Sequence, residues 1–153
     1  MDRLWAPWRN KYITAKKQKS CIFCSANKKS DYVFIKTQLS VAMLNAFPYN
    51  NGHILVAPLR HIKDLKNLKE NELLDLFNTI NRAIALLNKI LRPKGYNVGI
   101  NMGRVAGAGI PGHIHFHIVP RWNGDTNFMS TINSTRVISQ SLDELCKRLK
   151  NGK

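Results

Sequence analysis

Long hydrophobic runs are missing from this sequence. No apolar stretch reaches the roughly 18 residues that a membrane-spanning helix needs, so we expect no membrane partner. The first residues are basic and rich in tryptophan, without the apolar core or cleavage site of a secretory signal, and this favours a cytoplasmic protein. Internal repeats, low-complexity tracts and linkers are absent too. The 153 residues, 44% of them hydrophobic, are enough to bury a real core, and we expect a single domain over residues 1–153.

Acidic residues are scarce, because the chain has 9 Asp and Glu against 24 Lys and Arg and a net charge of +15. Two interpretations compete: a surface that binds polyanions, such as nucleotide polyphosphates or RNA, and an ordinary solvated lysine surface. The second is favoured for most of these lysines, although the positive field would still steer a polyphosphate substrate. Residues 1–20 form a basic arm, which we expect to pack onto the domain through Trp5, Trp8 and Tyr12; stacking on a nucleic-acid base is the alternative.

Hydrophobic periodicity predicts an α+β fold. The clearest helix covers residues 70–91, where apolar residues recur every three or four positions and form one stripe: Leu73, Phe77, Ile80, Ile84, Leu87 and Leu91. Asn67 and Glu70 resemble a capping pair at its start. Runs rich in β-formers predict strands at residues 31–36, 40–45, 53–57, 96–102 and 113–119. After a polar loop at 123–135 comes a short C-terminal helix at 141–149, so we expect an antiparallel sheet of about five strands with one long helix packed across it.

Three of the five histidines alternate with apolar residues in the segment 112–120. Alternation is the period of a β-strand, so His113, His115 and His117 are predicted to share one face while the apolar residues between them face the core. Neighbouring imidazoles on such a face lie about 6–7 Å apart. Pro120 cannot donate a ladder hydrogen bond and is expected to mark the strand's end. A purely structural role for three alternating histidines is disfavoured.

Two kinds of chemistry use several imidazoles on one face, namely metal binding and nucleophilic attack on phosphorus. The preceding segment 101–109 is rich in small residues, which allow backbone N–H groups to approach phosphate oxygens. Arg121 follows the histidine strand directly. Together these features predict a phosphate site beside a nucleophilic imidazole. The segment 107–112 also matches Gly-x-Gly-x-x-Gly, but a strand of histidines follows it instead of a helix, which excludes a Rossmann site.

The spacing His113-x-His115-x-His117 with apolar residues between resembles the histidine triad (HIT) superfamily of nucleotide hydrolases and transferases. Residues 50–61, which run Asn-Asn-Gly-His-Ile-Leu-Val-Ala-Pro-Leu-Arg-His, resemble a second segment of that family. Residues 4–9, the pair Cys21 and Cys24, and residues 119–125 are similar to a bacterial branch that resembles diadenosine tetraphosphate phosphorylases. The resemblance covers nearly the whole chain and implies a HIT-like fold, a homodimer and an adenine nucleotide substrate, without an organic cofactor.

The resemblance also implies a mechanism. His115 would attack the α-phosphorus of a dinucleoside polyphosphate and form a nucleotidyl-histidine, with its other ring nitrogen protonated and held by an acceptor such as a backbone carbonyl. An imidazole with an ordinary pKa of about 6.5 is already mostly neutral near pH 7 and needs no shift. His117 would hydrogen-bond the phosphate or the leaving-group oxygen. Water or orthophosphate would then release the nucleotide. The side chain of Asn101 and the backbone amides of the next loop would stabilise the equatorial oxygens: Gly107, Ala108 and Gly109.

Two further residues have both a functional and a structural interpretation. Asn45 lies where the family contacts the nucleotide ribose, but it also fits a cap at a strand end. His53 lies where the family keeps a histidine beside the active site, and here a supporting hydrogen bond to the loop is favoured. Among whole-protein alternatives we consider a nucleoside phosphoramidase, a nucleotide- or RNA-binding regulator without catalysis, and a catalytic metal site in the histidine cluster.

The sequence Cys21-Ile-Phe-Cys24 is a Cys-x-x-Cys turn with three interpretations: a redox pair, half of a zinc site, or two ordinary cysteines. A zinc site needs two more ligands. In the HIT family and the similar galactose-1-phosphate uridylyltransferases, two cysteines, a downstream histidine and the first triad histidine can bind one structural zinc. The resemblance therefore implies a zinc ligand set of Cys21, Cys24, His61 and His113. Cys146 lies in the C-terminal helical pattern, where we expect it to be at least half-buried.

Overall fold

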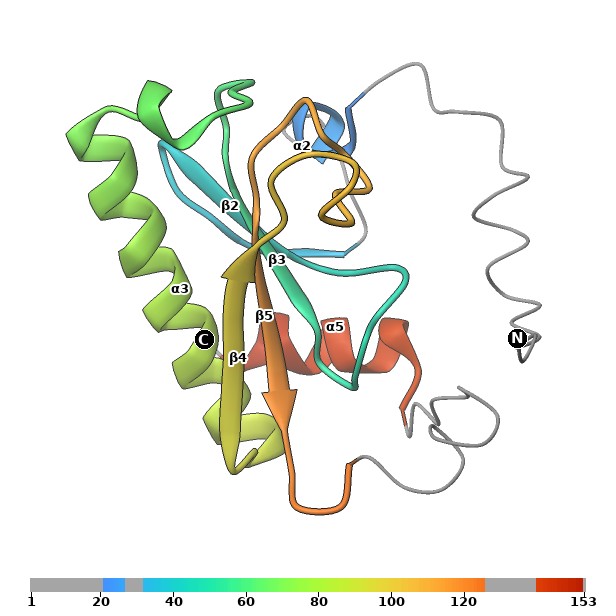
Figure 1. The fold of residues 1–153 in the computed structure, drawn as a ribbon. Coiled ribbons are helices and arrows are strands. Elements are labelled where there is room, and N and C mark those ends of the chain that lie inside the picture. The colour runs from blue at the N-terminus through green and yellow to red at the C-terminus, as the bar shows by residue number, and fades with distance from the viewer. Residues whose placement is uncertain (1–20, 27–31, 126–139, 153) are drawn as a thin grey trace, which may run out of the picture.

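The computed structural model describes residues 21–26, 32–125 and 140–152 (Figure 1). The basic arm 1–20 and most of the predicted loop 123–135 lie outside the described residues. The elements, in chain order, are α2 (Ile22–Ala26), β1 (Val33–Lys36), β2 (Ser40–Leu44), β3 (Ile54–Pro58), the 3₁₀ turn η1 (Leu65–Asn67), α3 (Glu70–Leu91), β4 (Gly95–Ile100), β5 (Phe116–Arg121) and α5 (Leu142–Asn151). None of the helices in these ranges is both long enough and apolar enough to span a bilayer.

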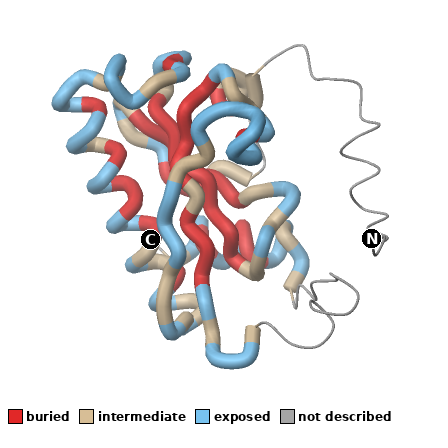
Figure 2. The backbone as a smooth tube through the Cα atoms, in the orientation of Figure 1, coloured by how far each residue is buried: buried red, intermediate tan, exposed pale blue. Residues whose placement is uncertain are grey.

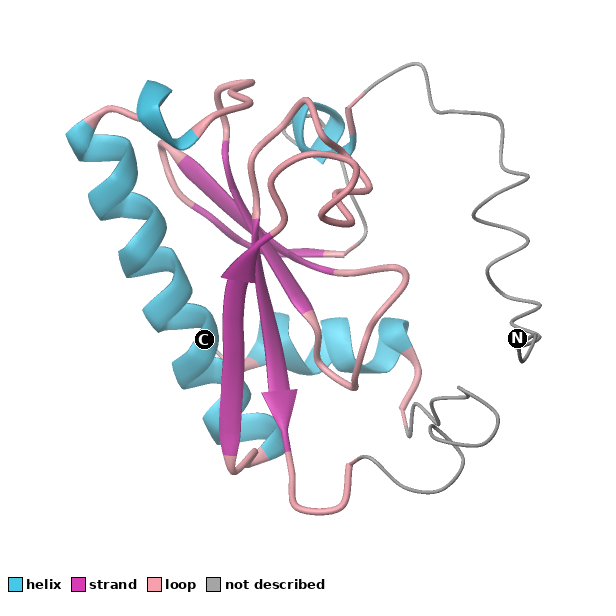
Figure 3. Ribbon diagram, in the orientation of Figure 1, coloured by secondary structure: helices cyan, strands magenta, loops and turns pink. Residues whose placement is uncertain are grey.

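The five strands form one antiparallel sheet in the order β1-β2-β3-β5-β4. The long helix α3 runs along one face, and α5 packs beside it against β1 (Figures 1 and 3). This architecture confirms the predicted fold: an antiparallel sheet of five strands, one long helix and a short C-terminal helix. The backbone is buried through the middle strands and along the inner side of α3, as Figure 2 shows.

The inner strand β2 is buried on both faces and separates two apolar clusters. Ala42 and Leu44 face the larger cluster under α3 and α5, whereas Val41 and Met43 face a smaller one that contains Phe23 of α2. Alternate residues of a strand point to opposite faces, so a strand covered on both sides has no polar face. The smaller cluster therefore holds α2, with its cysteines, against the sheet.

The bounds of α3 agree with the predicted helix 70–91, but its buried face differs from the predicted stripe. The residues of the helix that are buried are Glu72, Leu76, Thr79, Ile80, Ala83 and Leu87. Leu73 and Phe77, which the periodicity assigned to the core, are 42% and 50% exposed. The helix has more apolar residues than one face requires, and the small Thr79 and Ala83 permit a close approach to the sheet. The hydroxyl of Thr79 also lies 2.8 Å from that of Ser40 on β2.

The predicted cap of this helix is wrong as well. The N-cap is Lys69, whose backbone N–H donates to Glu72 Oε2 at 2.9 Å, and Asn67 belongs to η1 instead. At the other end, Arg92 adopts a left-handed conformation with φ of 48° before Pro93, which cannot continue the helix.

The histidine strand also differs from the prediction at both ends. β5 begins at Phe116, so His113 and His115 precede it, and the backbone N–H of Ile114 donates to Ile62 O at 2.7 Å, outside the strand ladder. Pro120 does not end the strand but pairs with Tyr96 of β4. On its other side β5 pairs with β3 only as far as Ile118. The missing N–H of proline therefore interrupts no bond to β3.

The Arg60–Glu72 ion pair joins the segment after β3 to the start of α3. Arg60 donates to both carboxylate oxygens, at 2.8 and 2.6 Å, and holds the pKa of the buried Glu72 at about 2. Because the pKa of Glu72 in the unfolded chain is higher, near its ordinary value of 4.5, the pair stabilises the fold above pH 4.5. This stabilisation disappears as the pH falls towards 2.

We therefore expect Glu72→Gln to lower the free energy of unfolding at pH 7 by about 1.5–3 kcal/mol, the usual size for hydrogen bonds to charged groups. Urea unfolding of both proteins at pH 7, 5, 4 and 3 measures the difference. The difference should shrink as the pH falls below 4.5. A difference that is constant with pH would assign the effect to lost packing instead of the ion pair.

Candidate active site and metal cluster

His115 lies in the short segment before β5, and its side chain is buried. Its Nδ1 lies 2.8 Å from the backbone oxygen of His113. A carbonyl oxygen can only accept a hydrogen bond, so Nδ1 is the protonated nitrogen and Nε2 carries the lone pair. The ring of Phe23 lies 5.0 Å from that of His115 and supports its orientation. The structure therefore contains the backbone-carbonyl acceptor that the sequence analysis expects for a nucleophilic imidazole.

His117, on β5, is the end of a chain of hydrogen bonds. The backbone N–H of Tyr49 donates to His53 Nδ1 at 3.0 Å, which makes His53 Nε2 the protonated nitrogen. His53 Nε2 then donates to His117 Nδ1 at 2.9 Å, so His117 in turn keeps its proton on Nε2. Asn101 Nδ2 lies 3.4 Å from this Nε2, and because both nitrogens carry hydrogens in this tautomer, the two form no hydrogen bond with each other. His115 therefore presents a lone pair, whereas His117 presents a hydrogen-bond donor. The centroids of the two rings are 4.9 Å apart.

Burial keeps both rings neutral. Desolvation lowers the pKa of His115, and desolvation together with the neighbouring His115 lowers the pKa of His117 to about 4. The mechanism expected from the sequence needs no change in the pKa of His115. The structure nevertheless lowers this pKa, and the lower pKa favours the unprotonated nucleophile. Both shifts favour the neutral form of each ring near neutral pH.

The structure places Asn45 and His53 at the two ends of the loop between β2 and β3. Asn45 Oδ1 accepts from the N–H of Phe47 at 3.0 Å, and its Nδ2 lies 3.2 Å from His53 Nδ1. Asn45 therefore caps the loop, and its contact with a nucleotide ribose stays a prediction. His53 supports the loop as expected.

Sequence analysis missed Tyr49, whose ring stacks on His117 with centroids 5.6 Å apart and planes 12° apart. The only signal in the sequence is an aromatic residue among the turn-forming residues of this loop.

The loop 101–112 approaches the histidines through Asn101 at its start. Gly107 has a φ of 91°, a conformation that L side chains rarely adopt. The N–H groups of Gly107 and Ala108 donate within the loop, to Arg104 O and Gly103 O. Two of the three amides predicted to contact phosphate are therefore engaged in the loop's own turns, whereas Gly109 has no backbone acceptor in the part of the chain that the structure describes.

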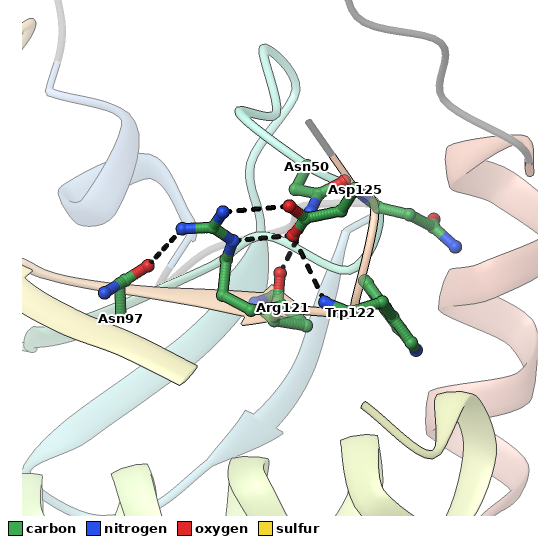
Figure 4. Close-up of polar contacts among 7 residues, drawn as sticks. Asn50, Asn97, Arg121, Trp122 and Asp125 are labelled. Carbon is green, nitrogen blue, oxygen red and sulfur yellow. Dashed lines mark hydrogen bonds and ion pairs between the residues drawn. The ribbon is translucent and has the colours of Figure 1, made fainter. Parts of the chain in front are cut away.

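Arg121 does not join the phosphate site that the sequence analysis assigned to it. It lies at the far end of β5 and forms an ion pair with Asp125, with Nε 2.6 Å from Oδ2 and Nη2 2.8 Å from Oδ1 (Figure 4). The adjacency to the histidines in sequence is misleading because the strand extends past Pro120 and takes Arg121 away from the site.

A second cluster lies beside the first. Cys21 directly precedes α2, Cys24 lies in α2, His61 follows β3, and His113 precedes β5. Their ligand atoms all lie within 4.8 Å of one another. The Nδ1 of His113 is 3.2 Å from Cys21 Sγ and 3.7 Å from Cys24 Sγ, and Cys24 Sγ is 3.3 Å from His61 Nδ1. Metal–ligand bonds of about 2.0–2.3 Å imply edges of about 3.3–3.8 Å in a tetrahedral zinc site. These three separations lie in this range or within about 0.1 Å of it.

The chemistry of the donors also fits a metal ion. His113 Nε2 donates to Pro58 O at 2.9 Å, which leaves the lone pair on Nδ1, the atom that faces the two sulfurs. Desolvation lowers the pKa of His113 to about 4, so this lone pair is available at neutral pH. Desolvation and the adjacent Cys21 raise the pKa of the Cys24 thiol, and a bound cation would offset this by favouring the thiolate. Two cysteines and two neutral histidines can therefore hold one metal ion here.

Comparisons with known proteins decide the family. The model of the HIT domain matches residues 26–124. The chain belongs to the histidine triad (HIT) family. A relative named AP-4-A phosphorylase from Mycobacterium tuberculosis is 35% identical over 93% of this chain and 79% of its own length. A relative from Schizosaccharomyces pombe, named bis(5'-nucleosyl)-tetraphosphatase (asymmetrical), is 40% identical over 61% of this chain and 50% of its own length.

The solved structures include a zinc-bound histidine triad family protein from Mycobacterium smegmatis. It is 26% identical to this HIT protein and covers 87% of this chain and 92% of its own, with a TM-score of 0.70. The likeness extends over the strands and helices described above, and confirms the HIT fold.

Proposed function

We propose that this HIT protein cleaves dinucleoside polyphosphates, such as diadenosine tetraphosphate, through a nucleotidyl-histidine intermediate on His115. The observation that carries the proposal is the 2.8 Å contact between His115 Nδ1 and His113 O, which leaves the Nε2 lone pair as the nucleophile. The phosphorylase and tetraphosphatase names of the two relatives support the substrate class. The net charge of +15 supports it further, because it attracts polyphosphates.

In the first half-reaction, His115 Nε2 attacks the α-phosphorus, a P–N bond forms, and the P–O bond to the remaining polyphosphate breaks. The ring acquires positive charge, which the His113 carbonyl stabilises through the Nδ1–H. The Nε2–H of His117 donates to the leaving oxygen. Asn101 and the Gly109 amide stabilise the equatorial oxygens as charge collects on them. In the second half-reaction, water or orthophosphate attacks phosphorus, the P–N bond breaks, and neutral His115 is restored.

The cluster of Cys21, Cys24, His61 and His113 is proposed to hold a structural zinc ion. When bound, the ion would supply stability by joining α2 to the segments that follow β3 and precede β5. His113 contributes its ring to the cluster and its carbonyl oxygen to His115. Holding His113 in place therefore also holds the acceptor that selects the tautomer of the nucleophile. A cytoplasmic location, where thiols stay reduced, suits these cysteines.

The test of the reaction is incubation with diadenosine tetraphosphate, with and without orthophosphate, and separation of the products by chromatography. ADP and ATP formed only with orthophosphate indicate a phosphorylase. AMP and ATP formed without it indicate a hydrolase. Without turnover under either condition the proposal fails, and adenosine phosphoramidates and then nucleotide binding alone become the next functions to assay.

A homodimer is proposed through β4 and α3. β4 is an edge strand, and Val98, on the same face as Tyr96 and Ile100, is 47% exposed. The exposed Leu73 and Phe77 of α3 add to this apolar surface. A flat edge strand with exposed apolar side chains is a template for pairing with a second copy.

We expect Val98→Lys to convert a dimer to a monomer by placing a charge in this surface, with a change in sedimentation velocity as the readout. Leu65→Lys, an apolar-to-lysine change in η1 instead of β4, is the matched control and should sediment like the unmodified protein. If Val98→Lys leaves the sedimentation coefficient unchanged, the proposed interface is wrong.

A further inference from the structure

The segment after the histidine strand contains a nearly buried carboxylate that the proposed chemistry does not use. The side chain of Asp125 is only 9% exposed. Its Oδ2 accepts from Arg121 Nε at 2.6 Å, from Asn50 Nδ2 at 2.9 Å and from the backbone N–H of Trp122 at 3.2 Å (Figure 4). Its Oδ1 accepts from Arg121 Nη2 at 2.8 Å, and Asn97 on β4 accepts from Arg121 Nη1 at 2.7 Å. This group of Asn50, Asn97, Arg121 and Asp125 is called the Asp125 latch below.

The latch connects β5 to the loop between β2 and β3. Asn50 Nδ2 donates to Pro120 O at 3.1 Å in addition to Asp125. Its own backbone oxygen accepts from the N–H of His53 at 3.1 Å, and its Oδ1 accepts from the N–H of Asn51 at 3.0 Å. Asn50 is therefore fixed to the sheet through its side chain and fixes the loop through its backbone. Asp125 supplies the strongest of these anchors, because its carboxylate is charged and accepts from two side chains.

The loop segment held by the latch sets the proton position on two histidines. Tyr49, the neighbour of Asn50, donates its N–H to His53 Nδ1 at 3.0 Å, and its ring packs 4.5 Å from that of His53. His53 Nε2 therefore donates to His117 Nδ1, which leaves the proton of His117 on Nε2. If the loop moved by about 1 Å, the Tyr49 contact would be lost, and the Asn45 amide, 3.2 Å from His53 Nδ1, would alone hold this tautomer of His53. His117 would then present a donor to the leaving group only part of the time.

We infer that Asp125, acting through Asn50, Tyr49 and His53, is a positioning residue that fixes the tautomer of neutral His117 as a hydrogen-bond donor to the leaving group. The inference rests on the proposed function for its catalytic consequence. It gives a role in catalysis to Asp125 and Arg121, two residues that the proposed mechanism does not place in contact with the substrate. A latch that served only stability would affect all substrates alike. A latch that serves this hydrogen bond matters most where much negative charge develops on the leaving oxygen.

The experiment compares Asp125→Asn with the unmodified protein on two substrates. The phenyl ester of AMP has a weakly acidic leaving group that develops much negative charge as it departs, and the p-nitrophenyl ester of AMP has a far more acidic one that departs readily as its anion. We expect kcat for the first to fall by about 10- to 100-fold with KM nearly unchanged, and kcat for the second to change by less than about 3-fold. Glu72→Gln, which removes an ion pair away from the site, is the matched control and should change neither. An equal loss on both substrates would overturn the inference.

A double-mutant cycle tests the route. In a His53→Ala background, Asp125→Asn should cause little further loss, because the two changes interrupt one chain of contacts. Additive losses would contradict a route through His53. Nitrogen-15 NMR of the histidine rings supplies a readout that does not depend on turnover. His53 Nδ1 and His117 Nδ1 should be unprotonated in the unmodified protein, and this pattern should become mixed in Asp125→Asn. Unchanged ring signals would overturn the inference even if the protein proved to have another substrate.

Discussion

Replacement of His115 by alanine should reduce turnover of diadenosine tetraphosphate by about 10⁴-fold or more, because it removes the nucleophile and no other group can form the P–N bond. The lone pair at Nε2 is available for attack, since His113 O fixes the proton on Nδ1. Affinity for the nucleotide should change little, because the ring contributes to bond formation more than to binding. Initial rates and the dissociation constant of a non-cleavable analogue measure the two effects separately.

His115 is buried against Phe23, so the variant needs a test of its fold. Metal content and thermal unfolding of His115→Ala should stay close to those of the unmodified protein, apart from the cost of a small cavity. His115→Gly gives a positive control, since free imidazole can occupy the vacated space and restore part of the activity on an activated AMP ester. Full activity in either variant without imidazole would remove His115 from the mechanism.

Loss of the metal should have the second large effect. Structural zinc sites contribute about 10–16 kcal/mol of apparent binding energy, which exceeds the net stability of most domains. We therefore expect the purified protein to contain one zinc ion per chain, and its removal by a chelator to unfold much of the structure. Cys24→Ser should have the same effect, since it removes the sulfur that lies near both histidines, 3.3 Å from His61 Nδ1 and 3.7 Å from His113 Nδ1.

Cys146→Ala is the matched control, because Cys146 is buried in the core and lies outside the cluster. It should retain zinc and lose only modest stability. Zinc content by atomic absorption, with thermal unfolding before and after chelation, measures both. A metal whose removal abolishes activity but leaves the unfolding temperature unchanged would contradict a structural role and favour a catalytic one.

The sequence predicted local elements well where periodicity and turn residues act together. The helix 70–91 has both bounds right, and β2 and β3 are right within a residue or so, because proline and glycine mark their ends. The buried face of α3 was not predictable, because several apolar residues compete for it. Thr79 and Ala83, which an apolar stripe omits, decide how closely the helix approaches β2.

For the candidate site, the histidine pattern identified the residues but not their hydrogen bonds. Alternation placed His113 and His115 in the strand, whereas their segment bonds to Ile62 and the strand begins afterwards. The link from Tyr49 through His53 to His117 depends on how a loop folds over the sheet, and no local pattern encodes it. The prediction that Arg121 belongs to the phosphate site was wrong for the same reason. Its ion pair with Asp125 forms only because the chain turns after β5, and that turn cannot be seen in the local pattern.

The central claim is that cleavage passes through a covalent nucleotidyl group on His115. The most direct measurement mixes the protein with diadenosine tetraphosphate for milliseconds to seconds without orthophosphate, quenches in base, where a phosphoramidate survives, and maps the modified peptide by mass spectrometry. The account predicts an AMP adduct on His115 that forms no more slowly than turnover and disappears when orthophosphate is added. An adduct on another residue, or turnover with no adduct at any time under single-turnover conditions, would contradict it.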